Sequence, residues 1–451
     1  MAGECHDLER RRGWLFHPHF PRDWRRCSLY ALADWVNGIA FRDIHFSANG
    51  RPVIKIAEIK GGISEQTKFT TQVFDDCVLV RSGDLLFSWS GQPETSIDAF
   101  WWRGPEGWLN QHVFKVTVRE GVDTVFFFYL LRYLKPHFVA IARNKQTTGL
   151  GHVTKRDLES MAVGVPGVSE QRAIAHILGT LDDKIELNRK MAATLEAMAR
   201  ALFRAWFVDF EPVRAKIEGR WQRGQSLPGL PAHLHDLFPD RLVDSELGEI
   251  PEGWRWGTLG EIAENPRRSA RPEDIVEGTT YIALEHMPRR SLALAEWTSA
   301  NAVESNKFCF KRGDILFGKL RPYFHKVGIA PIHGVCSTDI AVVVPRQQVW
   351  WAFASLLLSS AEFVAFADQA STGTKMPRTS WRDMARYPLA IPPSELAAPF
   401  DQLIRPLLDK IVALVHESRT LAAIRDALLP KLVSGELRVK DAEAFLRELA
   451  L

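Results

Sequence analysis

The chain has 451 residues, 46% of them hydrophobic, which is enough for a large core and too long for one ordinary domain. Its 57 Lys and Arg residues against 54 Asp and Glu leave a formal charge of +3, so the overall field is weak and nucleic acid could bind only through local basic patches. The 5 cysteines are scattered and never form a C-x-x-C pair, which argues against a disulfide framework and against a zinc ribbon.

Residues 1–22 are expected to form an N-terminal tail. They contain ERRRGW with no apolar run behind it, which is not the pattern of a secretory signal. His17 and His19 have no third ligand near them in the sequence, so no metal site is predicted. No window approaches about eighteen uninterrupted apolar residues. These features predict a soluble, cytoplasmic protein with no membrane partner.

Segments of the first half of the chain recur, in the same order, in the second half. The pairs are DWRRCSLYALAD (23–34) with GWRWGTLGEIAE (253–264), PVIKIAEI (52–59) with TYIALEHM (280–287), G-D-x-L-F from Gly83 with G-D-x-L-F from Gly313, TTGLGHVTKRDL (147–158) with STGTKMPRTSWRDM (371–384), GVP-GVSEQ with AIP-PSEL, and LDDKIELN (181–188) with LLDKIVAL (407–414). This ordered set indicates an internal duplication into two long units.

Each unit is expected to begin with an α+β globular domain, over 23–168 and over 251–393. Short runs such as VIKIAEI, CVLVRSGDLLFSW and VFKVTV are separated by Gly, Pro and Asn, which is typical of strands and turns. TVFFFYLLRYL and WWAFASLLLSSAEFVAF are long and apolar, which predicts buried helices. The fold class is therefore α+β, with two tandem repeated domains.

A long amphipathic helix is predicted after each domain, over 169–207 with Ser169 as N-cap and over 394–433. Apolar residues follow alternating steps of four and three, as in a coiled coil, with Asn188 on the first seam as a register device. Gly179 and Pro406 predict a kink or break at matching places. Each helix could pack on its own domain, but the repeated seam favours an antiparallel pair. A connector over 208–250 and a C-terminal tail over 434–451 complete the division.

The motifs of the common nucleotide-dependent and hydrolytic enzymes are missing from the sequence. There is no G-x-G-x-x-G after a strand, no P-loop, no H-E-x-x-H and no G-x-S-x-G. The [DN]-P-P-[YF] string of amino-methyltransferases is also missing, and IPPS at 391–394 is better explained as a turn into a helix. The sequence gives no positive reason to expect catalysis.

The repeated G-D-[LI]-L-F unit, the T-G segment before an aliphatic-Pro turn and SEQRAIAHILGTLDDKIELN together resemble the specificity subunits of type I restriction–modification systems. The connector, from ALFRAWFVDFEPVRAKIEG onward, resembles the segment between the two recognition domains of that family. The resemblance extends from about Trp24 to Val439, and residues 1–22 have no recognised counterpart.

The resemblance implies a non-catalytic subunit with two target recognition domains, each reading one half of a bipartite site in double-stranded DNA. It further implies that the paired helices act as a ruler and as docking surfaces for two methyltransferase subunits. Those subunits would bind S-adenosylmethionine, so no cofactor is expected on this chain, and separate translocase–nuclease subunits would complete the restriction complex.

Residues that follow G-D-x-L-F and residues of the T-G segments are the predicted DNA contacts, because basic side chains suit phosphates and planar polar groups suit base edges. G-D-x-L-F itself is interpreted as a turn and a core strand. The candidates are Lys55, Ser88, Trp89, Ser90, Gln92, Lys145, Gln146, Thr147, Thr148, His152 and Lys155 in the first domain, and Lys319, Arg321, Tyr323, His325, Lys326, Thr374, Lys375, Arg378 and Thr379 in the second.

Two alternative functions fit the same sequence features. One is the DNA-reading subunit of a related system whose partner fuses methylation and cleavage. The other is a scaffold that carries two protein-binding domains on a coiled coil and never contacts DNA, since either kind of ligand could drive the divergence after G-D-x-L-F. The target sequence cannot be read from these residues, because recognition depends on geometry and on DNA shape as well as on residue type.

Overall fold

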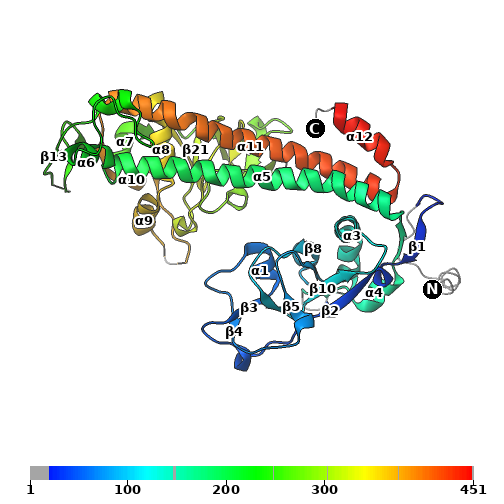
Figure 1. Ribbon diagram of the computed structural model, residues 1–451. Helices are drawn as coiled ribbons and strands as arrows, with labels where there is room; N and C mark the ends of the chain where they lie inside the picture. Colours follow the sequence, from blue (N-terminus) through cyan, green and yellow to red (C-terminus); the bar gives the residue numbers. More distant parts are fainter. Residues whose placement is uncertain (1–19, 146–148, 247, 302, 374, 449–451) are drawn as a thin grey trace. The chain divides into compact units, whose positions relative to one another are not determined.

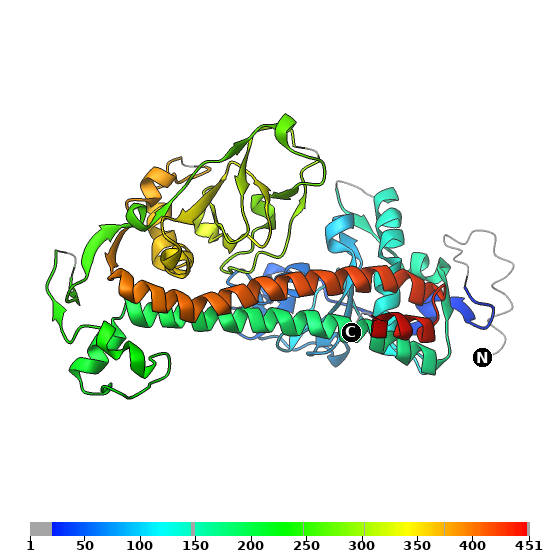
Figure 2. The ribbon, with the colours of Figure 1, turned by 90° about the horizontal axis from the view of Figure 1, so that it is seen from above.

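The computed structural model describes residues 20–145, 149–246, 248–301, 303–373 and 375–448 (Figures 1 and 2). Its contacts divide the chain into two compact units, Met1–Asp183 with Ala422–Leu451, and Lys184–Leu421. The division passes through two long helices, α5 (Val168–Phe207) and α11 (Ser394–Ser434), so each helix contributes residues to both units. The predicted domain boundaries assigned these helices and the connector as separate segments, whereas the contacts place the connector in the second unit.

The first unit is built from small antiparallel and mixed sheets. A four-stranded sheet has the order β2-β10-β6-β8, a second has the order β4-β3-β9-β5, and β1-β12 and β11-β7 are two-stranded. The strands are β1 (Arg25–Ser28), β2 (Ala33–Asn37), β3 (Arg51–Ile54), β4 (Phe69–Thr70), β5 (Leu79–Val80), β6 (Leu85–Ser88), β7 (Ser90–Gly91), β8 (Asp98–Trp101), β9 (Gly107–Leu109), β10 (Val113–Val118), β11 (Gly151–His152) and β12 (Ala162–Val165). The helices are α1 (Ile56–Gly61), α2 (Pro93–Ser96), α3 (Thr124–Asn144), α4 (Lys155–Ser160) and α12 (Val439–Glu448).

The second unit repeats this arrangement. Its sheet β16-β24-β21-β22 matches β2-β10-β6-β8, and β15-β25 matches β1-β12. The strands are β13 (Leu242–Val243), β14 (Ile250–Pro251), β15 (Arg255–Thr258), β16 (Ala263–Glu264), β17 (Ser269–Ala270), β18 (Thr280–Ile282), β19 (Thr298–Ser299), β20 (Lys307–Phe310), β21 (Ile315–Gly318), β22 (Val327–Ile329), β23 (Gly334–Cys336), β24 (Ile340–Pro345) and β25 (Pro388–Ile391). The helices are α6 (Glu211–Ile217), α7 (Leu259–Ile262), α8 (Trp351–Leu358), α9 (Ala361–Gln369) and α10 (Trp381–Met384). The shared strand order is what an internal duplication predicts.

The buried helices of both units lie where the apolar runs predicted them. In the first unit α3 packs against β8, β10 and β11, and most of its apolar side chains are buried there. Its length and composition would also suit a membrane span, as would the bent pair α8 and α9, but such helices are common in the cores of globular domains. The run VIKIAEI forms a strand only as far as Ile54 and then turns into α1, because the Glu58 carboxylate accepts the backbone N–H of Lys55 at 3.1 Å and caps the helix.

Both long helices are continuous, so of the predicted kink or break at Gly179 and Pro406 the break is wrong. A glycine inside a helix costs about 1 kcal/mol and a proline about 3 kcal/mol. Each position is flanked by side chains that are almost fully buried, Leu178 and Leu181 in α5, and Ile404 and Leu408 in α11. Burying one such side chain is worth roughly 1.5–3 kcal/mol, so packing outweighs the local preference.

Within each unit the α5 and α11 segments lie side by side and run antiparallel (Figures 1 and 2). In the first unit Arg425 pairs with Asp182, and Arg438 beyond α11 pairs with Glu170 at 3.0 Å. In the second unit Lys184 pairs with Glu417 at 3.2 Å, while Phe400 packs its ring on those of Phe203 and Phe207. The antiparallel pairing is the arrangement that the repeated seam favoured.

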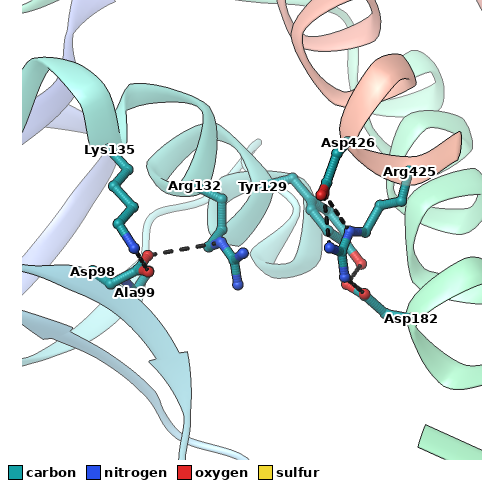
Figure 3. Close-up of polar contacts among 8 residues, drawn as sticks. All are labelled: Asp98, Ala99, Tyr129, Arg132, Lys135, Asp182, Arg425 and Asp426. Atoms are coloured by element: carbon teal, nitrogen blue, oxygen red, sulfur yellow. Dashed lines mark hydrogen bonds and ion pairs between the residues drawn. The ribbon is translucent and has the colours of Figure 1, made fainter. Parts of the chain in front are cut away.

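Polar contacts fasten the core helix α3 to both long helices in the first unit, as Figure 3 shows. The Tyr129 hydroxyl donates to Asp182 at 2.7 Å, and Arg425 pairs with the same carboxylate and with Asp426. Burial and the Asp182 carboxylate both raise the pKa of Tyr129, which keeps the hydroxyl protonated as the donor. One acidic side chain on α5 therefore links the first globular domain to the helix pair.

The connector is packed rather than extended. Rings of Trp206 and Trp221 stand edge-on to Phe238 at centroid distances of 5.2 and 5.8 Å, which fixes the connector against the end of α5 in the second unit. The ammonium of Lys216 reaches the carbonyl of Phe238 at 2.6 Å and holds the returning loop.

Candidate nucleic-acid interface

The G-D-x-L-F motif forms the same turn and strand in both units. Gly83 and Gly313 take φ values of +95° and +88°, which residues with a side chain rarely adopt. The next carboxylate closes each turn, since Asp84 accepts the N–H of Arg81 at 2.7 Å and Asp314 accepts that of Lys311 at 2.8 Å. The strands that follow, β6 and β21, hold matching places in their sheets. The motif is therefore structural in both copies.

The segment after each of these strands pairs with the T-G segment of the same unit. In the first unit His152 pairs with Ser90 in the β11-β7 ladder. In the second unit the N–H of Arg321 donates to the carbonyl of Pro377 at 2.7 Å, and that of Thr379 donates to Lys319 at 3.1 Å. The two candidate segments of each unit, far apart in the sequence, thus form one surface.

The second unit gathers positive charge on this surface. We call it the cationic surface and define it as Arg267, Arg289, Arg290, Lys319, Arg321 and Arg378. The guanidinium carbons of Arg289 and Arg321 lie 4.2 and 5.9 Å from the ring centroid of Phe324. Burial lowers the pKa of Lys319, and the neighbouring charges of Arg378 and Arg267 lower it further. Such crowding of like charges is unfavourable until an anion approaches.

The backbone of this surface is strained. Arg267, Arg290, Arg321 and His325 all have positive φ values, between 45° and 57°, and the only other described non-glycine residue of this kind is Phe210. Each such conformation costs on the order of 1–3 kcal/mol and is commonly retained at functional sites. Arg321 and His325 flank the short helix η8 (Pro322–Phe324), where Tyr323 is 51% exposed.

Acidic side chains also reach the cationic surface. Asp339 pairs with Arg378, and Glu285 lies near enough to act on the charge of Lys326. Lys375 is exposed at the tip of a hairpin closed by hydrogen bonds between Thr372 and Arg378. The hairpin therefore carries a cation outward beside the cationic surface.

Three of the second-unit candidates point inward. The ring of His325 contacts the carbonyl of Ser359 at 2.9 Å, and the ammonium of Lys326 donates to the carbonyl of Leu284 at 2.5 Å. Burial lowers the pKa of both groups. Thr379 is buried, and its hydroxyl has no partner among the described residues. These side chains shape the loops from inside.

The corresponding surface of the first unit is less basic and more aromatic. Trp89 is half-buried, stacks on Phe114 at 5.7 Å and donates from its indole N–H to Asn37 at 3.1 Å. Ser88 and Ser90 are buried in the strands, whereas Gln92 is exposed at the start of α2. Gln92 is thus the exposed planar polar group among these four residues.

The candidate lysines of the first unit are largely engaged within the protein. Lys145 reaches both carboxylate oxygens of Asp157 at 2.6 Å; burial raises the pKa of that carboxyl, but hydrogen bonds from Lys145 and Thr154 outweigh burial and hold it below its usual range. Lys155 lies 4.8 Å above the ring of Tyr30, and Lys55 lies 5.3 Å from that of Phe46. Four further candidates lie outside the described residues: Gln146, Thr147, Thr148 and Thr374.

Sequence reasoning missed Arg267, Arg289 and Arg290. The signal that could have found the last two is the Arg-Arg pair of MPRRS, which follows the repeated segment TYIALEHM. Arg267 lies in the same P-R-R-S string, in NPRRS at 265–269, so the same signal could have found it. Among the residues that the structure describes, no group of three or more His, Cys, Asp or Glu side chains could hold a metal ion.

Comparison with known proteins identifies relatives over much of the chain. A family model for the type I restriction modification DNA specificity domain matches residues 21–197. The specificity subunit of the type I restriction enzyme MjaIX from Methanocaldococcus jannaschii is 25% identical over 74% of this chain and 73% of its own length. The EcoDI specificity subunit from Escherichia coli is 27% identical over 60% of each chain, and that of HindI from Haemophilus influenzae is 25% identical over 67% of this chain and 74% of its own.

A solved structure shares the fold. The S subunit of a type I restriction–modification system from M. genitalium aligns with a TM-score of 0.52 at 14% identity, covering 93% of this chain and 99% of that one. The alignment therefore extends over both repeated units, beyond the residues that the family model matches.

Proposed function

We propose that this chain, which belongs to the family of type I restriction–modification DNA specificity subunits, binds double-stranded DNA sequence-specifically without catalysing a reaction itself. One observation carries the proposal. In each unit, the segment after G-D-x-L-F and the T-G segment are far apart in the sequence but meet on one surface, beside strands that both units share. A constant frame with divergent loops suits two copies of a domain that read different sequences.

We propose that each unit reads one half of a bipartite target. In the second unit the cationic surface would contact phosphates, and Arg321 would be suited to the paired acceptors of a guanine edge. In the first unit Gln92 could pair with an adenine edge, with Trp89 and His152 beside it. Lys375, Tyr323 and Arg378 would add contacts in the second half-site, while Lys55, Lys145 and Lys155 would contribute less because other side chains already engage them.

We further propose that a methyltransferase subunit docks on α5. Leu187, Met191 and Met198 are exposed and lie on one face of that helix, at spacings of four and seven residues. No large hydrophobic side chain of α11 is among the exposed ones in the described part of the chain. An apolar stripe on one helix suits the helix of a partner. S-adenosylmethionine would bind that partner, and translocase–nuclease subunits would join the assembly through it.

The proposal predicts the methylation pattern of a cell that holds this chain together with its methyltransferase partner. Methylated adenines should fall in two short half-sites separated by a spacer of fixed length and free sequence. Sequencing that detects methylated bases would measure this directly, with cells holding the partner alone as the control. Methylation confined to one undivided motif, or unchanged by the chain, would contradict the proposal.

A further inference from the structure

Glu196 is a buried acid on α5 that contacts the second globular domain. It is 5% exposed, and both of its carboxylate oxygens are fully engaged. One oxygen accepts the Nε and Nη2 donors of Arg200 at 3.1 and 2.6 Å, and the other accepts the Ser291 hydroxyl and the Leu292 N–H, both at 3.0 Å. These four hydrogen bonds use the whole accepting capacity of a carboxylate.

Two residues that donate to Glu196, Arg200 and Ser291, are also linked to each other through residues of the basic loops. Arg200 donates to the carbonyl of Ser359, which ends α8 and also faces the Nε2 of His325 at 2.9 Å. Because a carbonyl can only accept, that His325 nitrogen carries the hydrogen. The carbonyl of His325 accepts the N–H of Arg290 at 2.9 Å, and Arg290 precedes Ser291 in the chain. Together with the peptide bond between Arg290 and Ser291, these hydrogen bonds form a closed ring, which we call the circuit.

The circuit ties two loops of the cationic surface to one helix. The loop 289–292 carries Arg289 and Arg290, and the loop 321–325 carries Arg321 and Tyr323. Both loops contain residues with positive φ, which persist only when their surroundings fix them. Removing the Glu196 carboxylate would leave donors of Arg200 and the Leu292 N–H without their acceptor. The loss of these hydrogen bonds would relax the two loops.

We infer that Glu196 is a positioning residue, which fixes the two basic loops of the second unit in the relative placement that reads one half-site. The inference rests on the proposed function, since it assigns a cause to the geometry of that same surface. Glu196 does not contact DNA itself; its effect passes through Ser291 on one side and through Arg200, Ser359 and His325 on the other.

The chain offers a closely matched control in Asp401 on α11. Asp401 is also buried, at 8% exposed, pairs with an arginine four residues on, Arg405, and accepts a backbone N–H, that of Ala352, at 3.0 Å. It holds the start of α8 rather than the basic loops. Asp401→Asn therefore reproduces the loss of a buried helix carboxylate without touching the circuit.

The experiment compares the parent chain, Glu196→Gln, Ser291→Ala and Asp401→Asn, each in complex with the methyltransferase partner. Binding is measured to the cognate duplex and to duplexes altered in one half-site or the other. Glu196→Gln should lower discrimination at one half-site by about tenfold, comparable to one mismatched base pair, and leave the other half-site unchanged. Ser291→Ala removes the hydroxyl that donates to Glu196 and accepts the Ala293 N–H, and it should shift the same half-site in the same direction by less. Asp401→Asn should leave discrimination at both half-sites unchanged.

The outcomes separate this inference from the function on which it rests. A parent complex without sequence discrimination overturns both. Discrimination that Glu196→Gln and Ser291→Ala leave intact at both half-sites overturns the positioning role alone. An equal loss at both half-sites in Glu196→Gln and in Asp401→Asn also overturns it, because a general loss of stability would then explain the result.

Discussion

Arg321 is held in a conformation that has to be maintained by its surroundings. Its φ of +51° is unfavourable for a residue with a side chain, and its Nε is a buried donor with no partner among the described residues. An unsatisfied buried donor costs about 1–3 kcal/mol, which adds to the cost of this conformation. Together with the two guanidinium groups around Phe324, this indicates a surface prepared for an anionic ligand.

Replacing Arg321 or Lys375 should therefore change the salt dependence of DNA binding. Arg321→Ala and Lys375→Ala should each weaken binding of the assembled complex and reduce the slope of log K against log salt by about 0.9 for each phosphate that the variant no longer neutralises. Titrations at several salt concentrations would measure the slope. Arg312→Ala is the matched control, because Arg312 is exposed in the turn at the opposite end of β21. Parent-like slopes in both variants would remove these residues from the set of phosphate-binding side chains.

At the scale of elements, local signals located the long helices and misjudged their interiors. The Pro-Gly and Pro-Pro turns place the two starts at Val168 and Ser394, close to the predictions, because a turn residue and a cap act within a few positions. The interior of each helix depends on burial, which a propensity at Gly179 or Pro406 does not report. The run VIKIAEI was predicted as a strand because its apolar side chains alternate. That pattern does not report the hydrogen bond from the Lys55 N–H to the Glu58 carboxylate, which caps α1 and ends the strand.

The buried Asn188 of α5 should lower the stability of the helix pair. It is 1% exposed, and both atoms of its amide lack a partner among the described residues. Asn188→Leu should therefore raise the free energy of unfolding by about 1–3 kcal/mol, the usual cost of an unsatisfied buried group. Thermal denaturation of the full chain would measure the gain, with Asn188→Ala as a control that removes the amide but leaves a gap. A lower melting temperature for the leucine variant would show that the amide is satisfied in solution.

At the scale of the whole molecule, the internal duplication made the shared turns and strands predictable. It made the candidate site only partly predictable. Two copies of G-D-x-L-F identify a turn and strand that both must keep, and residues that differ beyond them mark the loops. The pairing of those loops with the T-G segments follows from strand order, which the sequence does not state. Arg267, Arg289 and Arg290 reach the surface through contacts between distant segments, and the inward position of His325 depends on Ser359. Such contacts become visible only in the fold.

The two helices shared by both units lead to a prediction about the DNA spacer. Deleting seven residues from α5 together with the seven that face them on α11 removes about 10.5 Å of helix and keeps the apolar face within about 20°. If the helices act as a ruler, the spacer between half-sites should shorten by about three base pairs, at roughly 3.4 Å each, while both half-sites stay the same. Deleting the segment from one helix alone breaks the register and should abolish methylation. Methylation mapping would measure both results, and an unchanged spacer at normal efficiency in the double deletion would exclude the ruler.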